Sequence, residues 1–262
     1  MPFVANRAFG WTPVEITPDW GLRTLKTGMA YPLCASLQCQ VCGLLFLDIR
    51  FSDAEMAALY AGYRGADYAA QRDRFEPGYA AINAAMLAHV PDTGPAERFL
   101  ADHVQPKPRV LDWGGDTGEN TPFRAAASAV DIFDISGRPV AAGARRVSRE
   151  ALAGARYDLV VLSHVLEHAP EPETLVREAS AALGDGAILY VEVPYEGLIA
   201  AAPQSRDLAP AKKYWHEHVN FFTETAMRSL LARCGLEVAA LQTRAFDSLA
   251  GIDRVMSVAA KR

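Results

Sequence analysis

From residue 109 onward, short apolar runs alternate with amphipathic stretches along the chain. Residues 157–163 and 187–193 are almost continuously apolar, which is typical of strands that are covered on both faces. Helices are predicted from Pro172 to Gly184 and after Thr223, where apolar residues recur at helical spacing. This alternation of strands and helices predicts an α/β fold with a mostly parallel sheet and helices on both of its faces.

Shorter apolar segments complete the expected sheet. They bring it to seven strands and lie at 109–112, 129–135, 145–148, 236–242 and 254–260. After the first strand, Thr121 followed by Pro122 predicts the start of a helix, because proline is tolerated in the first helical turn. Residues 195–214 show no clear period, and we interpret them as a candidate lid.

The N-terminal part of the chain has a less regular pattern. The apolar run at 44–47 predicts a buried strand, and Ser52 with Glu55 forms a capping box at the start of a predicted helix. A second helix is expected within 78–90, and prolines then separate this region from the sheet. We therefore predict a small N-terminal α+β domain and a larger domain that carries the sheet, with ranges 1–104 and 105–262.

Composition and charge narrow the functional classes. The chain has 262 residues and a net charge of −5, with a pI of about 5.7, which argues against a broad nucleic-acid-binding face. No apolar stretch reaches the roughly 20 residues of a membrane span. Because residues 1–13 lack the pattern of a signal peptide, we expect a cytoplasmic protein without a membrane or nucleic-acid partner.

A glycine-rich turn follows the strand that ends at Asp112. Gly114, Gly115 and Gly118 allow a sharp turn close to a ligand, so the strand and turn predict a nucleotide cradle at the carboxyl end of a parallel sheet. Asp134 ends the next strand, where a carboxylate can accept hydrogen bonds from both ribose hydroxyls.

The spacing of the turn separates two families. A dinucleotide-binding fold needs glycine at 114, 116 and 119, whereas this chain has Asp116 and Glu119. The pattern D-x-G-x-G-x-G fits except for Asp116, and it resembles motif I of class I S-adenosylmethionine-dependent methyltransferases. Residues 157–168 resemble the F-D-x-V-x-x-x-x-V-L-E-H segment of that family, and residues 183–189 resemble its L-x-P-G-G-x-L turn.

The resemblance covers about residues 109–262 and implies a Rossmann-like fold with S-adenosylmethionine as cofactor. The cofactor-binding residues that it implies are Asp112, Gly114, Gly115, Asp116, Gly118, Asp134, Ser163 and His164. The carboxylate of Asp116 has two opposite interpretations: it pairs with the ammonium group of the cofactor, or it crowds the site. The second interpretation keeps open a catalytically inactive binding or accessory protein.

Residues 164–168 also match H-x-x-E-H, a pattern of zinc peptidases. That motif requires a helix, so that both histidines share one face. Here it directly follows a predicted buried strand, and a metal-dependent hydrolase is therefore the weaker alternative.

A second cluster of chemically active residues lies at 214–222. It resembles a stretch of sugar C-methyltransferases, and the resemblance implies that His218 is the catalytic base. We expect Glu217 and His216 to help to orient the acceptor or the imidazole ring. The acceptor implied is a small molecule, in particular a nucleotide-linked sugar. Basic residues could meet its phosphates: Arg206, Lys212 and Lys213.

Three cysteines lie in the N-terminal region. Residues 31–68 resemble the zinc-knuckle region of the same sugar C-methyltransferases, with Cys34, Cys39 and Cys42. That region normally carries two cysteine pairs, and the first pair is missing here. Because a structural zinc ion takes four protein ligands, we predict a relic knuckle and no bound metal.

Overall fold

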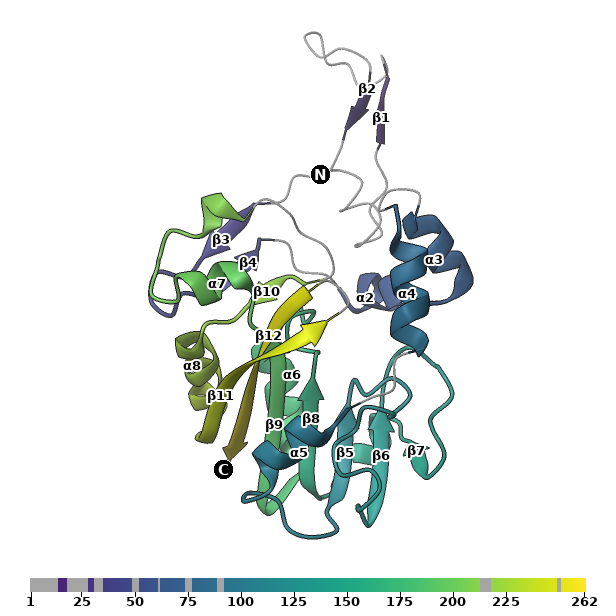
Figure 1. The fold of residues 1–262 in the computed structure, drawn as a ribbon, viewed down its shortest axis with the longest axis vertical. Coiled ribbons are helices and arrows are strands. Elements are labelled where there is room, and N and C mark those ends of the chain that lie inside the picture. Colours follow the sequence, from purple (N-terminus) through teal and green to yellow (C-terminus); the bar gives the residue numbers. More distant parts are fainter. Residues whose placement is uncertain are drawn as a thin grey trace.

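The computed structural model describes residues 14–17, 28–30, 35–48, 52–60, 62–73, 77–88, 92–212, 218–248 and 251–262. Its largest element is a seven-stranded sheet with the order β11-β12-β9-β8-β5-β6-β7 (Figure 1). The strands are β5 (Arg109–Trp113), β6 (Ala129–Phe133), β7 (Ala144–Arg146), β8 (Tyr157–Ser163), β9 (Leu183–Pro194), β11 (Glu237–Ser248) and β12 (Gly251–Lys261). Neighbours from β7 to β9 are parallel, and only β12 runs antiparallel to β9 and β11. The predicted mostly parallel seven-stranded sheet is confirmed.

Both faces of the sheet centre are covered, as the continuous apolar runs predict. In β8, Leu159 and Val161 pack toward α5 (Gly94–Leu100), whereas Val160 and Leu162 belong to the larger core on the other face. Helices α6 (Pro172–Ala181) and α8 (Glu224–Arg233) contribute to that larger core. In Figure 1, α5 crosses in front of the sheet and α6 lies behind it.

The direction of chain progression reverses at the centre of the sheet. From β5 the chain adds β6 and β7 on one side, and β8 and β9 follow on the other side. The carboxyl ends of β5 and β8 therefore lie next to each other at a topological switch point. In open α/β sheets, ligands bind in the crevice outside these strand ends.

The N-terminal elements lie on the carboxyl side of the parallel strands (Figure 1). Two strands of the cysteine region, β3 (Ser36–Gln38) and β4 (Leu45–Leu47), form an antiparallel sheet with β10 (Asn220–Phe221) in the order β10-β4-β3. Three helices accompany them: α2 (Asp53–Tyr60), α3 (Ala66–Asp73) and α4 (Tyr79–Ala88). A separate two-stranded pairing joins β1 (Val14–Ile16) and β2 (Gly28–Ala30).

The predicted helix caps are confirmed. The Thr223 hydroxyl accepts a hydrogen bond from the backbone N–H of Ala226 at 3.0 Å, which fixes the start of α8. At α2, the carboxylate of Glu55 accepts a hydrogen bond from the Ser52 backbone N–H at 2.7 Å, as a capping box requires.

The helix predicted from Thr121 and Pro122 is wrong. Residues 122–126 form turns, and Phe123 has a φ of 59°, outside the right-handed helical region. The backbone N–H of Phe123 donates instead to the carboxylate of Glu97 in α5, at 2.8 Å. A long-range side-chain contact thus replaces the helix, and the turn after β5 is not followed by a helix N-terminus.

The described part of the candidate lid is folded onto the rest of the protein. Residues 195–212 contain α7 (Gly197–Ala201) and the short 3-10 helix η3 (Ala209–Ala211), and Ile199 and Leu208 are buried. The backbone N–H of Leu208 donates to the Gln38 side chain in β3 at 2.7 Å. This segment therefore packs against β3. The sequence did not predict this packing, because residues 195–214 have no clear hydrophobic period.

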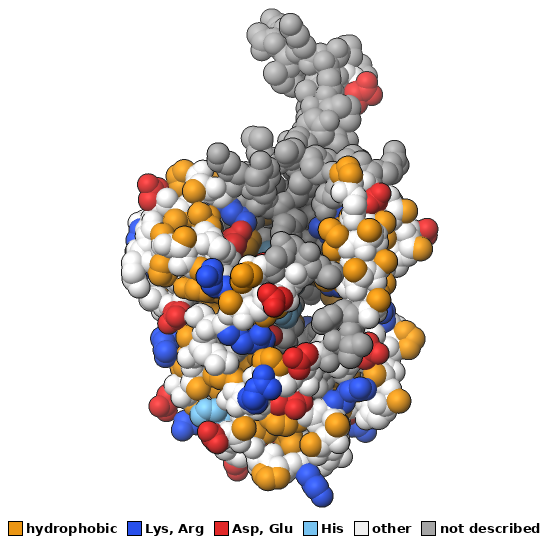
Figure 2. Space-filling view, viewed as in Figure 1, with side chains coloured by type: hydrophobic (Ala, Val, Ile, Leu, Met, Phe, Trp, Pro, Cys, Tyr) orange, Lys and Arg blue, Asp and Glu red, His pale blue; other side chains and the backbone are white. Residues whose placement is uncertain are grey.

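The surface mixes charge types. Acidic and basic side chains are interspersed over the face shown in Figure 2, and hydrophobic side chains gather over α3 and α4. On α4 these include Ile82, Met86 and Leu87, which are exposed, while Asn83 is buried. Among the described helices, none combines the length and the apolar character that crossing a membrane requires.

Candidate functional site

The turn after β5 has an unusual backbone. Gly114, Asp116 and Gly118 all have positive φ angles, of 84°, 51° and 78°. The backbone N–H of Gly114 donates to the carbonyl oxygen of Phe133 at 2.7 Å, which ties the turn to β6. A Cβ atom on Gly115 would lie 2.5 Å from Cγ of Asp112, so glycine is required there for the turn to pack.

Asp112 supports this turn from within the protein. Its carboxylate is buried and accepts a hydrogen bond from the Thr121 hydroxyl at 2.6 Å. The pKa of Asp112 is raised to about 6, because burial outweighs the lowering effect of the Thr121 hydrogen bond and the negative charge of Asp134 acts in the same direction as burial. Asp112 therefore acts on the turn as a buried hydrogen-bond partner.

Asp134 lies at the carboxyl end of β6, beside the turn. Its two carboxylate oxygens accept hydrogen bonds from the backbone N–H groups of Asp116, at 2.9 Å, and Ser136, at 2.6 Å. Each carboxylate oxygen has more than one lone pair, so both oxygens keep capacity to accept from ribose hydroxyls. Asp134 thus holds the turn and presents acceptor atoms at the same point.

The structure shows a partner for Asp116 that the sequence did not indicate. Its carboxylate forms an ion pair with Arg138 and accepts a hydrogen bond from the Ser136 hydroxyl at 3.1 Å. Both members of the ion pair are about one-third exposed. The aspartate adopts a left-handed conformation of the kind that glycine favours, and its charge is compensated within the protein.

The loop that follows β8 packs against the glycine turn. A Cβ atom on Gly114 would lie 2.6 Å from a methyl carbon of Val165. Ser163 is the last residue of β8, and His164 follows it with a φ of 55° and a backbone N–H that donates to the Glu192 carbonyl oxygen at 2.9 Å. The structure therefore brings the predicted residues Ser163 and His164 to the same strand ends as the turn.

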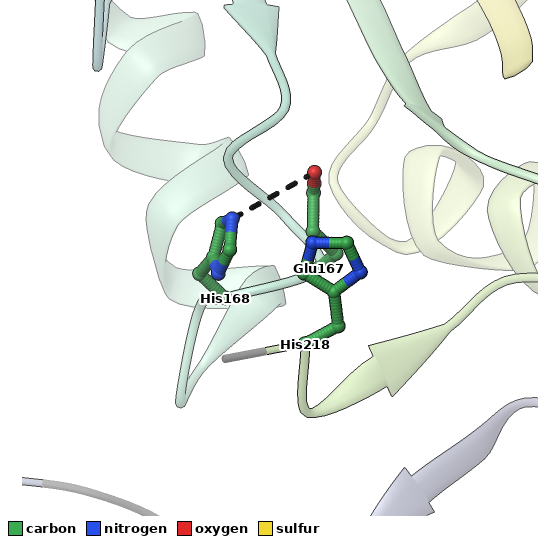
Figure 3. Close-up of side chains that lie close together, drawn as sticks. All are labelled: Glu167, His168 and His218. Carbon is green, nitrogen blue, oxygen red and sulfur yellow. Dashed lines mark ion pairs between the residues drawn. The ribbon is translucent and has the colours of Figure 1, made fainter. Parts of the chain in front are cut away.

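Three ionisable side chains converge where this loop meets the segment before β10: Glu167, His168 and His218, here called the histidine cluster (Figure 3). One oxygen or nitrogen atom of each lies within 4.8 Å of the others. Glu167 Oε1 lies 3.9 Å from His168 Nε2, and the centroids of the two imidazole rings are 4.8 Å apart. Two motifs that the sequence shows separately thus meet at one place.

Backbone hydrogen bonds hold the two motifs together. The N–H groups of Val219 and Asn220 both donate to the carbonyl oxygen of Glu167, at 2.7 and 3.1 Å. The buried side-chain amide of Asn220 donates to the carbonyl oxygens of Leu166, at 3.0 Å, and Ala169, at 2.7 Å. Asn220 therefore fixes the position of His218 relative to the loop after β8.

The surroundings of Glu167 lower the pKa of its carboxyl group. Burial acts to raise the pKa of Glu167, but the contact with His164 and the charges of His168, His164 and His218 outweigh it and lower the pKa. For His164, burial acts to lower the pKa, and the interactions with Glu167 and Glu192 outweigh it and raise the pKa. Nδ1 of His164 lies 3.2 Å from Glu167 Oε1.

Sequence reasoning missed a second carboxylate next to His164. Glu192 in β9 is buried, and it accepts hydrogen bonds from the hydroxyls of Tyr190, at 2.8 Å, and Ser257, at 2.9 Å. Arg244 donates to the same carboxylate at 3.2 Å. The sequence does carry a signal for Glu192, which is the one charged residue in the otherwise apolar run 187–193. A charged residue in a buried strand requires a partner, and this predicts a polar network around it.

Some predicted residues lie outside the described parts of the chain: His216, Glu217, Lys213 and Cys34. Lys212 is mostly buried and paired with Glu196, so the phosphate contact predicted for it has no support in this arrangement. Cys39 and Cys42 are free thiols in the turn between β3 and β4. Hydrogen bonds from backbone N–H groups, first that of Cys42, lower the pKa of Cys39.

The fold and the site define a Rossmann-like methyltransferase. The chain belongs to the methyltransferase domain family, whose match covers residues 85–241. The prediction of a class I S-adenosylmethionine-dependent methyltransferase is thereby confirmed. The match extends across both the glycine turn and the histidine cluster.

A solved structure shares this fold. The 1,6-didemethyltoxoflavin-N1-methyltransferase of Burkholderia thailandensis, solved with 1,6-didemethyltoxoflavin and S-adenosylhomocysteine, is 16% identical. The similarity covers 86% of this chain and 97% of that one, with a TM-score of 0.55. The magnesium protoporphyrin IX methyltransferase of Synechocystis PCC 6803 is also 16% identical, covering 70% and 87%, with a TM-score of 0.45. No curated protein sequence matches the chain.

Proposed function

We propose that this enzyme transfers the methyl group of S-adenosylmethionine to a small molecule bound at the histidine cluster. One observation carries this proposal. The turn after β5 and the loop after β8 leave neighbouring strands at the switch point and pack together through Gly114 and Val165. The cofactor turn and the histidine cluster are therefore two ends of one site.

The residues at the switch point fit the cofactor. Asp134 presents two carboxylate oxygens for the ribose hydroxyls, and the turn already has the left-handed backbone that motif I needs at Gly114, Asp116 and Gly118. Ser163 and His164 border the same strand ends. Because Arg138 compensates the charge of Asp116, we assign Asp116 to shaping the turn and not to binding the cofactor ammonium group.

The reaction requires alignment and, for many acceptors, removal of a proton. The sulfur–methyl bond breaks with its electron pair going to sulfur, while the acceptor atom forms the new bond to the methyl carbon. Holding donor and acceptor in line supplies much of the acceleration. His218 is the residue that we assign to take the acceptor proton in the metal-free protein, since an imidazole titrates near neutral pH.

The acceptor is a small molecule. The structure from Burkholderia thailandensis contains bound 1,6-didemethyltoxoflavin, which is a small molecule. For this chain, a nucleotide-linked sugar is the first acceptor to test, on the resemblance of residues 214–222 to sugar C-methyltransferases. The ring of Tyr60 in α2 meets His168 edge-on, with centroids 6.0 Å apart, so α2 forms one wall of the acceptor side.

Two measurements test the proposal. Calorimetric titration with S-adenosylhomocysteine should show one binding site per chain. Radiolabelled S-adenosylmethionine, incubated with the enzyme and a panel of nucleotide-linked sugars, should then give a labelled product. A wild-type protein that binds neither S-adenosylmethionine nor its demethylated product would refute the proposal.

A further inference from the structure

We propose that the histidine cluster binds one divalent first-row transition metal ion. The ligands are the carboxylate of Glu167 and one imidazole nitrogen each of His168 and His218. The inference deepens the proposed function, because it places an ion where the acceptor binds. Binding of the ion by itself can be measured without any methyl transfer.

The first observation is the convergence of three good ligands. Their donor atoms lie within 4.8 Å of one another, and Glu167 Oε1 is 3.9 Å from His168 Nε2 (Figure 3). Ligands that bind one ion at about 2.0–2.2 Å are themselves separated by roughly 3–4 Å. Small side-chain rotations are enough to close the cluster around an ion.

The second observation is the buried carboxylate. The Glu167 side chain is 2% exposed, and neither of its oxygens makes a hydrogen bond of good geometry with the described residues. The nearest basic group is Nδ1 of His164, 3.2 Å from Oε1. A buried carboxylate is costly unless it is paired or coordinates a metal, and a divalent ion would bind the carboxylate oxygens on the side of His168 and His218.

The ligand types indicate the class of metal. Two imidazoles and one carboxylate suit zinc, iron or manganese, and the combination is that of metal sites with open coordination positions. At such open positions, oxygen atoms of a substrate would complete the coordination. The acceptors that fit best carry two adjacent oxygens, such as neighbouring hydroxyls or a hydroxyl next to a carbonyl.

Neighbouring groups support the ligands. His164 contacts the Glu167 carboxylate, and the N–H groups of Val219 and Asn220 hold the Glu167 backbone. Partners of this kind orient the ligands of metal sites. They come from both of the segments that the cluster joins.

This site differs from the H-x-x-E-H peptidase pattern. In that pattern a helix places both histidines of the motif on one metal, whereas residues 164–168 form a bend and turns here. The second histidine ligand is His218, from a distant segment. The inference also departs from the sequence prediction of no metal, which concerned the cysteines and the peptidase motif.

An ion changes the role of His218. A nitrogen that coordinates a metal has no lone pair left to accept a proton, so His218 is a ligand in the metal-bound enzyme. A bound ion would lower the pKa of a coordinated acceptor hydroxyl, so that its proton could pass to solvent without a base from the protein. With an oxygen acceptor of this kind, the sulfur–methyl bond would break with its electron pair going to sulfur, and the acceptor oxygen would form the new bond to the methyl carbon.

Titration with Co²⁺ tests the site directly. Full-length protein without a tag is freed of metal with a chelator and dialysed, and Co²⁺ binding is followed by calorimetry and visible absorption. A Cys39→Ser/Cys42→Ser double variant serves as parent, because thiolates of the cysteine turn also bind metals. We expect one Co²⁺ per chain in this parent, and an affinity at least about tenfold lower in His168→Asn and in His218→Asn.

His103→Asn is the matched control, since His103 follows α5 and lies outside the cluster; it should bind Co²⁺ like the parent. Unchanged affinity for S-adenosylhomocysteine shows that each variant is folded. The proposal is overturned if the parent binds no Co²⁺, or if both cluster variants bind it as tightly as the parent. Binding of S-adenosylhomocysteine and methyl transfer are measured separately, so failure of the metal site and failure of the proposed function are distinguishable.

Discussion

The imidazole ring of His218 lies 4.8 Å from that of His168, centroid to centroid, with the ring planes at 75°. His168 belongs to the loop after β8, and His218 immediately precedes the Val219–Asn220 backbone that binds this loop. Their proximity joins the loop that packs on the glycine turn to the segment that precedes β10. It makes the two histidines the first targets for mutation.

His218→Ala should lower turnover by roughly 100-fold or more, with cofactor affinity near wild type. The variant lacks the base that takes the acceptor proton in the metal-free enzyme, or a ligand of the ion in the metal-bound enzyme. Steady-state kinetics with the identified acceptor and calorimetry with S-adenosylhomocysteine measure the two effects. His103→Ala is the control. Full turnover in His218→Gln would assign the residue to packing alone.

Asp134→Ala should weaken binding of S-adenosylhomocysteine by on the order of 2–4 kcal/mol, because two ribose hydrogen bonds are lost. The turn also loses the acceptor for the backbone N–H of Asp116. Calorimetric titration measures the change, and Asp185→Ala, at an exposed position of β9, is the control. Equal affinities in the two variants would contradict the role of Asp134.

Asp116→Gly and Asp116→Ala should differ in stability. Both remove the ion pair with Arg138, which at this exposure is worth about 0–1 kcal/mol. Only glycine removes the cost of a φ of 51°, so the alanine variant should be less stable than the glycine variant by about 1 kcal/mol. Urea unfolding measures this.

The glycine variant should also bind S-adenosylhomocysteine at least as tightly as wild type, since it restores the motif. A tenfold loss of affinity in Asp116→Gly would show that the carboxylate contacts the cofactor.

Asp112 should make stability depend on pH. Its pKa of about 6 in the folded protein lies above its ordinary value near 3.9, so between these values the folded state binds more protons than the unfolded state. The free energy of unfolding should therefore fall as the pH rises from about 4 to 6, and Asp112 should account for about 2–3 kcal/mol of this fall. Above that range, Asp112 is ionised in both states and adds no further pH dependence.

Asp112→Asn cannot ionise and lacks this dependence. The difference in unfolding free energy between variant and wild type, measured in urea at several pH values, should shift in favour of the variant as pH rises. A difference independent of pH would refute the assignment.

Asn220→Ala should destabilise the protein by about 1–3 kcal/mol, because two buried carbonyl oxygens lose their donor. It should also lower turnover, since His218 is no longer held beside Glu167. Urea unfolding and kinetics measure the two effects, with Asn120→Ala at an exposed position as the control. Unchanged stability would show that the amide does not hold the loop.

The sequence predicted local structure well where the local signal was complete. The bounds of β8 agree with the apolar run 157–163, and Thr223 caps α8 as expected. The helix predicted to begin after Thr121 is not formed, because the backbone N–H of Phe123 donates to the carboxylate of Glu97 in α5. The sequence also did not predict α3 (Ala66–Asp73), an eight-residue helix whose apolar side chains are three alanines and one tyrosine, so its hydrophobic signal in the sequence is weak.

The sequence by itself determined the sheet, the glycine turn and the family, because strand periodicity and turn chemistry are properties of neighbouring residues. Only the tertiary structure decided that Arg138 compensates Asp116 and that His218 meets Glu167 and His168. These contacts join loops that leave different strands, and loop packing at strand ends produces no period in the chain. The histidine cluster exists because Val219 and Asn220 bind the backbone of Glu167, a relation that forms only when the sheet is assembled.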